Sequence, residues 1–273
     1  MNFNQRFSPL MRKSVQLIFL LCPVVANGNV TIYKNDYSVL AYEDGQDNVT
    51  TLTLSGGSND AGASSPADCT VKLALKQKKG TWSADLAPFH TELMDYDDVS
   101  RDVALIERDR QQIRLYFPES LSVCPLGTEF SGDYKKIEMN DASFKDNFNV
   151  LLAMNYYSAI SEARGGKTKQ AITYLEPYMK ESLSNNIYNM AVYNDYGYFL
   201  QEAGRAEESI SYFEKVIEKN PGRIVVYLNM ADSYWIIGEK ITARSYYSHY
   251  KKLMSKAGKN SLIPVRVAHR LNE

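Results

Sequence analysis

The chain has 273 residues, of which 44% are hydrophobic and 23% charged, and its net charge is −1. This length suits two modest domains. No polybasic stripe is present, which argues against nucleic acid as a partner.

The N-terminal segment has the pattern of an export signal. Arg6, Arg12 and Lys13 form a basic leader, and residues 15–26 are apolar except for one glutamine, too few to span a bilayer. We predict a signal peptide over residues 1–26 with cleavage near Ala26, and hence a periplasmic or secreted protein. An uncleaved anchor is the alternative. Removal of the leader leaves 28 basic and 32 acidic residues, a net charge of −4, and no further membrane span.

Cleavage also removes Cys22, so that two cysteines remain, Cys69 and Cys124. An exported chain with two cysteines in one domain is expected to join them in a disulfide. Closing that loop would stabilise the fold by about 4 kcal/mol in the chain-entropy model. Two buried thiols are the alternative.

Residues 27–138 alternate between apolar and polar side chains, the pattern of half-buried strands. We expect a small antiparallel β-sandwich or barrel of six to eight strands. The predicted strands include residues 30–33, 49–54, 71–75, 81–84, 103–106 and 113–117, with turns at 76–80 and 109–112.

The end of this β-rich domain carries a compact closing pattern. Cys124 precedes a glycine turn, and Phe130, Gly132, Tyr134 and Lys135 follow as aromatic-x-Gly-x-Tyr-Lys. The pattern is similar to that of small secreted domains associated with lysozyme inhibition. This resemblance implies an alternative function, in which the protein is an inhibitor or immunity protein that acts on a cell-wall-degrading enzyme through its β-domain.

From residue 147 to 273 the apolar period becomes helical. Gly166, Gly204 and Gly238 stand where turns within helical hairpins need a left-handed residue. Ser261 is expected to cap the final helix, with Pro264 in its first turn. The predicted helices cover residues 148–164, 168–182, 187–202, 206–219, 223–237, 240–256 and 262–271.

Six residues recur 34 positions later with similar size and character. They are Tyr193, Gly197, Leu200, Gly204, Ser209 and Phe213, which recur as Tyr227, Ala231, Tyr234, Gly238, Ala243 and Tyr247. This period resembles that of the tetratricopeptide repeat (TPR) family. The resemblance implies a C-terminal α-α superhelix of three hairpins plus a capping helix, and hence an α+β protein overall.

In TPR proteins the first helix of each hairpin lines a concave face that holds another polypeptide. The resemblance therefore implies a partner-binding set of Tyr156, Asn194, Tyr198, Gln201, Asn229, Asp232 and Trp235. Four aromatic residues are instead assigned to the core, namely Tyr193, Phe213, Tyr227 and Tyr247. The groove lacks the basic clamp that would favour a free carboxylate, and it could also be filled by the β-domain or by a second copy.

No arrangement of residues predicts catalysis or a cofactor. Residues 165–168 read Gly-Gly-Lys-Thr, but the upstream segment is helical and cannot frame a phosphate loop. His90, His249 and His269 lack metal-ligand spacing, and the acidic residues between 95 and 107 suit a solvated loop better than a calcium site. A hydrolase would require a cluster of acidic residues near His90.

The sequence therefore predicts a non-enzymatic adaptor that binds a protein or peptide in its concave groove, with no metal and no cofactor. Neither the partner nor the oligomeric state follows from the sequence.

Overall fold

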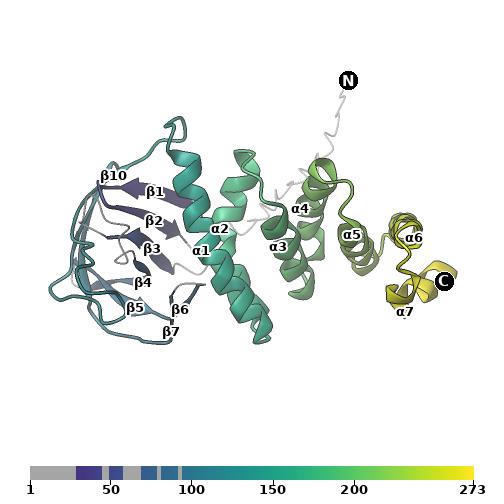
Figure 1. Cartoon of the computed structure of the whole chain (residues 1–273), viewed down its shortest axis with the longest axis horizontal. Coiled ribbons are helices and arrows are strands. Elements are labelled where there is room, and N and C mark those ends of the chain that lie inside the picture. Colours follow the sequence, from purple (N-terminus) through teal and green to yellow (C-terminus); the bar gives the residue numbers. More distant parts are fainter. Residues whose placement is uncertain (1–28, 45–48, 58–68, 79–80, 92–93) are drawn as a thin grey trace, which may run out of the picture.

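The computed structural model describes residues 29–44, 49–57, 69–78, 81–91 and 94–273. The predicted signal peptide lies outside these residues. Figure 1 shows a β-barrel at one end of an elongated molecule and a row of helices that runs from it to the C-terminus. The protein is thus α+β.

Eight antiparallel strands close into a barrel in the order β1-β10-β9-β8-β5-β4-β3-β2. Of the two predicted alternatives, sandwich or barrel, the structure is the barrel. A separate two-stranded hairpin, β6 and β7, lies beside it. The strands are β1 (Val30–Lys34), β2 (Ser38–Asp44), β3 (Thr50–Gly56), β4 (Cys69–Lys78), β5 (Thr81–Ala87), β6 (Phe89–His90), β7 (Asp95–Tyr96), β8 (Ala104–Arg108), β9 (Gln112–Tyr116) and β10 (Gly132–Lys136).

The six predicted strands are confirmed, including the pairing of β8 with β9, in which Ile106 lies opposite Leu115. Two barrel strands, β2 and β10, were not among the predicted strands. In β2 six successive residues are buried, because one face points into the barrel and the other is covered by helices. A strand buried on both faces loses the alternation by which strands are recognised.

The predicted disulfide is confirmed. Cys69, at the start of β4, is bonded to Cys124 in the loop before β10, with their Cα atoms 5.6 Å apart. The closing pattern that follows completes the barrel, since β10 pairs with both β1 and β9. Tyr134 is fully buried there, and its hydroxyl donates a hydrogen bond to the carbonyl of Phe130 at 2.9 Å.

Six helices pair into three hairpins, and a short seventh follows a 3₁₀ turn, η2 (Asn260–Leu262). The second and third hairpins repeat at 34 residues, because both of their helices begin 34 positions apart. The first hairpin is longer than the second, since α1 and α2 have 21 and 17 residues against 13 and 14 in α3 and α4. The helices are α1 (Phe144–Arg164), α2 (Thr168–Ser184), α3 (Met190–Glu202), α4 (Ala206–Lys219), α5 (Ile224–Ile236), α6 (Lys240–Lys256) and α7 (Val265–Asn272).

The assignment of Tyr193, Phe213, Tyr227 and Tyr247 to the core is confirmed, since each is at most 7% exposed. Gly197 lets the two helices of the second hairpin approach closely. A Cβ at this position would lie 2.6 Å from the ring of Phe213.

The predicted cap of the last helix is wrong. Ser261 lies within η2 and makes no capping hydrogen bond, and α7 begins only at Val265. Pro264 is extended, with ψ at 141°, so the helix starts after it instead of including it in the first turn.

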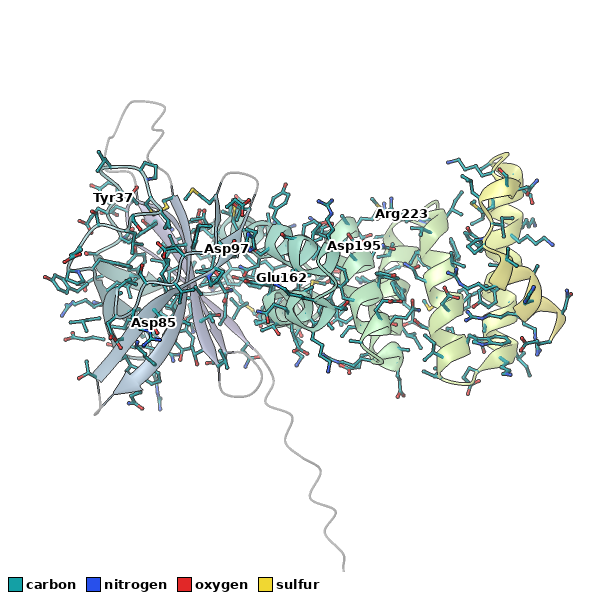
Figure 2. The ribbon with its side chains drawn as sticks, turned by 90° about the horizontal axis from the view of Figure 1, so that it is seen from below. Tyr37, Asp85, Asp97, Glu162, Asp195 and Arg223 are labelled. Atoms are coloured by element: carbon teal, nitrogen blue, oxygen red, sulfur yellow. A yellow bond between two sulfur atoms is a disulfide. The ribbon has the colours of Figure 1, made fainter. Side chains whose placement is uncertain are left out.

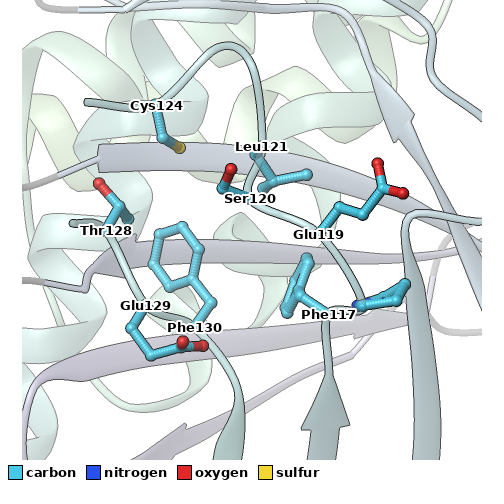
Figure 3. A pocket seen from close by; sticks show the side chains of 9 residues that line it. Phe117, Glu119, Ser120, Leu121, Cys124, Thr128, Glu129 and Phe130 are labelled. Carbon is cyan, nitrogen blue, oxygen red and sulfur yellow. The ribbon is translucent and has the colours of Figure 1, made fainter. Parts of the chain in front are cut away.

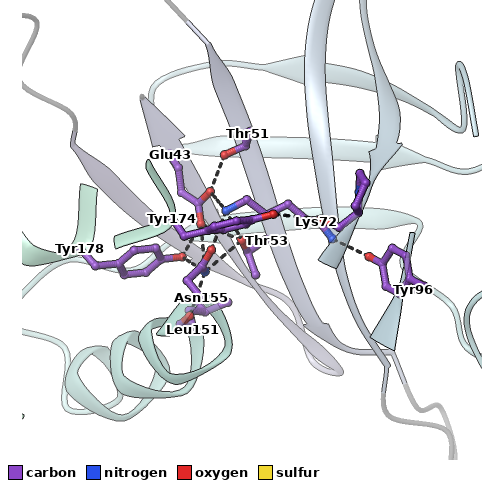
Figure 4. A network of polar contacts seen from close by, with 10 residues as sticks. Glu43, Thr51, Thr53, Lys72, Tyr96, Leu151, Asn155, Tyr174 and Tyr178 are labelled. Atoms are coloured by element: carbon purple, nitrogen blue, oxygen red, sulfur yellow. Dashed lines mark hydrogen bonds and ion pairs between the residues drawn. The ribbon is translucent and has the colours of Figure 1, made fainter. Parts of the chain in front are cut away.

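A buried polar cluster, which we call the joint, links the barrel to the first hairpin (Figure 4). It consists of Glu43, Thr53, Lys72, Asn155 and Tyr178. Lys72 on β4 donates to Glu43 on β2 at 2.5 Å and to the side-chain oxygen of Asn155 on α1 at 2.6 Å. Glu43 also accepts from Tyr178 on α2 at 2.5 Å and from Thr53 on β3 at 2.7 Å. None of these five residues is more than 5% exposed.

Because the charges in this joint are paired and hydrogen-bonded, their burial is compensated. Burial acts to raise the pKa of Glu43, but the Lys72 ammonium and the hydrogen bonds outweigh it and lower that pKa. The Asn155 and Tyr178 side chains tie α1 and α2 to the barrel. The β6–β7 hairpin is bonded directly to α1, since the Ser158 hydroxyl accepts the backbone N–H of His90 at 3.0 Å and donates to its carbonyl at 2.6 Å.

Candidate partner-binding face

The first helices of the three hairpins, α1, α3 and α5, stand side by side and form one face. Tyr156 on α1 donates a hydrogen bond to Asp195 on α3 at 2.7 Å. Gln201 on α3 donates to the carbonyl of Asn229 on α5 at 2.8 Å. We call this surface of α1, α3 and α5 the inner face.

The seven predicted binding residues all lie on these helices, but they differ in exposure. Asn194, Gln201, Asn229 and Asp232 are buried, at 5%, 6%, 8% and 8% exposure. Their amide and carboxylate groups make hydrogen bonds to neighbouring helices. For example, the side-chain amide of Gln201 donates to the hydroxyl of Ser233 at 2.7 Å. A contact between these four residues and a partner stays a prediction.

Three predicted residues keep accessible surface. Tyr198 is 42% exposed, and Tyr156 and Trp235 are half-buried. Burial is the main cause that raises the pKa of Tyr156, and the carboxylate of Asp195 adds to it. The pKa of Tyr198 is raised by burial and by Glu202. Both phenols are therefore neutral hydrogen-bond donors at ordinary pH.

Asp195 was not among the predicted residues. It lies on α3 directly after Asn194, accepts the Tyr156 hydroxyl, and borders a hollow on this face. At this point of α3 the family resemblance implies one groove residue, Asn194. In the structure it is the next residue, Asp195, whose side chain lies against α1. The contact between α1 and α3 could be found only from their packing.

The hollow has a volume of about 540 Å³ and lies between the β6–β7 hairpin, α1 and α3. Its walls combine aromatic, aliphatic and charged side chains, which are His90, Thr91, Asp95, Tyr156, Tyr157, Ile160, Ser161, Arg164 and Asp195. Figure 2 labels three acidic residues in this region, which are Asp97 just after β7, Glu162 on α1 and Asp195 on α3. The β-domain thus borders the groove at this end without filling it.

His90 lies between two carboxylates, with Asp95 at 2.6 Å from Nδ1 and Asp97 at 3.6 Å from Nε2. Both aspartates are more than 80% exposed. The acidic cluster that a hydrolase would require is therefore present in part. Among the residues that the structure describes, no three His, Cys, Asp or Glu side chains are grouped to hold a metal.

At the third hairpin the inner face is covered by the chain's own last helix. Arg266 and Arg270 on α7 bind the carboxylate of Asp232 at 2.7 Å and 2.5 Å. The Arg270 guanidinium also lies 5.2 Å from the ring centre of Trp235. Val267 of α7 is fully buried. The capping helix thus covers the side chain of Asp232 as well as the end of the repeat stack.

A second hollow, of about 190 Å³, lies on the barrel beside the disulfide (Figure 3). Phe117 and Phe130 form its apolar wall, and Glu119 and Glu129 stand at its edge. It belongs to the loops that the disulfide ties down.

No helix among the described residues is long and apolar enough to cross a membrane.

No protein-family model and no curated protein matches the chain. Among solved structures, the chain is similar to PcrH from Pseudomonas aeruginosa, at 14% identity and a TM-score of 0.38 over 50% of this chain and 97% of that one. It is also similar to MamA (MSR-1), at 13% identity and a TM-score of 0.35 over 44% of this chain and 75% of that one. At such scores these similarities say nothing about what the chain binds. The 34-residue hairpins of the chain itself make its helical half TPR-like.

Proposed function

We propose that the protein is a non-enzymatic adaptor that binds another polypeptide along its inner face, between the β6–β7 hairpin and α7. The observation that carries the proposal is the accessible aromatic surface of this face, where Tyr156 lines the 540 Å³ hollow and Tyr198 on α3 is 42% exposed. Stacked helical hairpins, continued as a TPR superhelix, give this surface the rigid frame that a partner needs.

The chemistry of the surface favours a peptide or a partner helix. Tyrosine supplies a large contact area at a small cost in side-chain entropy, and its hydroxyl can bond a peptide backbone. Asp195 and Glu202 add negative charge, while Arg164 at the far wall of the hollow is exposed. A partner with an apolar or aromatic anchor and basic flanking residues suits this arrangement.

The barrel contributes to the same surface. Because Ser158 on α1 bonds the backbone of His90 on β6, one partner would touch both halves of the protein. We infer that the β6–β7 hairpin of the β-domain forms one wall of the binding site.

The proposed compartment is the periplasm or the extracellular space. The support for it is the basic and apolar leader of residues 1–26, together with a disulfide between Cys69 and Cys124. Structural disulfides are typical of proteins that fold in oxidising compartments.

Affinity capture with the mature protein tests the binding role. Tagged wild type should recover a defined set of proteins from an envelope extract, and Tyr198→Ala and Tyr156→Ala should recover at least about tenfold less, since aromatic anchors carry most of an interface's free energy. Tyr116→Ala is the matched control, because Tyr116 is 55% exposed on the barrel. Equal recovery by all four proteins would show that the inner face is not the binding surface.

A further inference from the structure

An arginine points into one end of the barrel. On β8, Ala104 and Ile106 face the barrel core and are at most 4% exposed. Side chains alternate along a strand, so Arg108 lies on the same inward face as these two residues. Its guanidinium lies 3.5 Å from the ring centre of Tyr42, which is itself part of the barrel core.

Beside this stacked pair the barrel opens into a hollow of about 320 Å³. Leu75, Trp82 and Ile106 form its apolar floor, and Arg110 joins Arg108 at the rim. We call this hollow the barrel mouth. It lies on the opposite side of the barrel wall from the joint, because Tyr42 faces the core whereas Glu43 faces the helices.

Among the residues that the structure describes, neither Arg108 nor Arg110 has a carboxylate within ion-pair distance. Asp109, an acid that also lines the mouth, uses its Oδ1 atom to accept the backbone N–H groups of Gln111 and Gln112 at 2.7 Å and 2.8 Å. That carboxylate shapes the β8–β9 turn instead of pairing with the arginines.

We propose that the barrel mouth binds a small organic anion, a carboxylate carried on a planar apolar body. The apolar body would lie on Leu75, Trp82 and Ile106, and the carboxylate would accept the forked N–H donors of Arg108. Guanidinium groups recognise carboxylates in a bidentate manner, and stacking on Tyr42 fixes the plane of the fork in advance. The mouths of small barrels are a common place for such ligands.

Two sources could supply this chemistry, namely a free aromatic acid or the C-terminal carboxylate of a peptide that ends in phenylalanine. The hollow suits the smaller of the two, and we assign it the free acid. This site is independent of the inner face, so that failure of one proposal leaves the other standing.

Fluorescence of Trp82 provides a direct test. The chain has two tryptophans, so Trp235→Phe leaves Trp82 as the only reporter. Titration of this variant with 3-phenylpropionate should give a saturable change, with a Kd of about 1 mM for a ligand of this size. The neutral 3-phenylpropionamide should bind at least about tenfold more weakly, because the charge-assisted hydrogen bonds are lost. The phenylalanine-ended peptide should also bind more weakly than the free acid.

Arg108→Gln should weaken binding of the acid at least about tenfold and leave the amide unchanged, by loss of the same charge-assisted bonds. Arg108→Lys keeps the positive charge but not the forked pair of donors. Its affinity for the acid should lie between that of the parent and that of Arg108→Gln. Arg101→Gln, at an exposed arginine elsewhere on the barrel, is the matched control and should bind as the parent does. Thermal melting of each variant shows whether it is folded, and the acid should raise the Tm of the parent.

Three results would overturn the proposal: no saturable change up to about 10 mM acid, a concentration well above the expected Kd; equal binding of acid and amide; or equal binding by Arg108→Gln and the parent. Tighter binding of the peptide than of the free acid would assign the site to a chain terminus instead.

Discussion

Removal of one charge from the buried joint should destabilise the protein severely. Lys72→Met takes away the ammonium that lies 2.5 Å from Glu43 while leaving that carboxylate 1% exposed. The hydrogen bonds from Thr53 and Tyr178 remain, but they do not neutralise the charge. The free energy of unfolding should fall by about 3–5 kcal/mol, the usual effect of an uncompensated buried charge.

The double variant Glu43→Gln/Lys72→Met should recover most of that loss, because a neutral amide replaces the stranded carboxylate. Lys76→Met on the same strand is the matched control. Lys76 also pairs with an acid, Asp85, but its side chain is 26% exposed. The control should lose little stability, because a solvent-exposed ion pair contributes little to the free energy of unfolding.

Urea unfolding followed by fluorescence and circular dichroism measures these differences, and a loss of 3–5 kcal/mol corresponds to a fall in Tm of about 6–20 °C for a chain of this size. If Lys72→Met is as stable as Lys76→Met, the ion pair does not hold the joint as described. If the double variant is no more stable than Lys72→Met, the loss has a cause other than the unpaired buried carboxylate of Glu43.

The same joint gives a pH dependence with a defined sign. The pKa of Glu43 in the folded protein lies below its ordinary value of 4.5. A depressed carboxyl pKa stabilises the fold above the ordinary value, and this contribution is lost as the pH falls through the folded pKa. Wild type should therefore lose stability below about pH 4.5 more steeply than the Glu43→Gln/Lys72→Met variant. Parallel profiles in acid would contradict this linkage.

Three further outcomes follow from the packing. Reduction or Ala replacement of the Cys69–Cys124 disulfide, which spans 55 residues, should cost about 4 kcal/mol in the free energy of unfolding, and a loss below about 1 kcal/mol would refute the loop-closure argument. Gly197→Ala should cost at least about 1–3 kcal/mol through contact with Phe213, and an unchanged Tm would show that the two helices separate freely. Asp232→Asn should release α7, seen as faster amide hydrogen exchange in α7 alone, and unchanged exchange would mean that Val267 suffices to hold that helix.

The helical half could be predicted closely from the sequence, because its signals are local. Gly204 and Gly238 mark the hairpin turns and have positive φ of 81° and 89°. The 34-residue period of the sequence equals the spacing between the starts of corresponding helices. The exact start of α7 was missed because Pro264 precedes the helix instead of opening it.

The joint between the two halves could not be predicted, because it depends on contacts between residues far apart in the sequence. Glu43 lies in a strand buried on both faces, and Lys72 reads as the exposed position of an alternating strand. Only the packing of α1 against β2, β3 and β4 shows that both are buried together. The same holds for Asp195, whose partner on α1 is 39 residues away.

Photo-crosslinking tests the central claim most directly. A photoreactive phenylalanine analogue placed at Tyr198 in the full-length protein, expressed in its own cells, should give one discrete crosslinked polypeptide. The same analogue at Tyr116 on the barrel should not give it. An identical pattern at both positions, or none at Tyr198, would contradict the account that the inner face holds a partner.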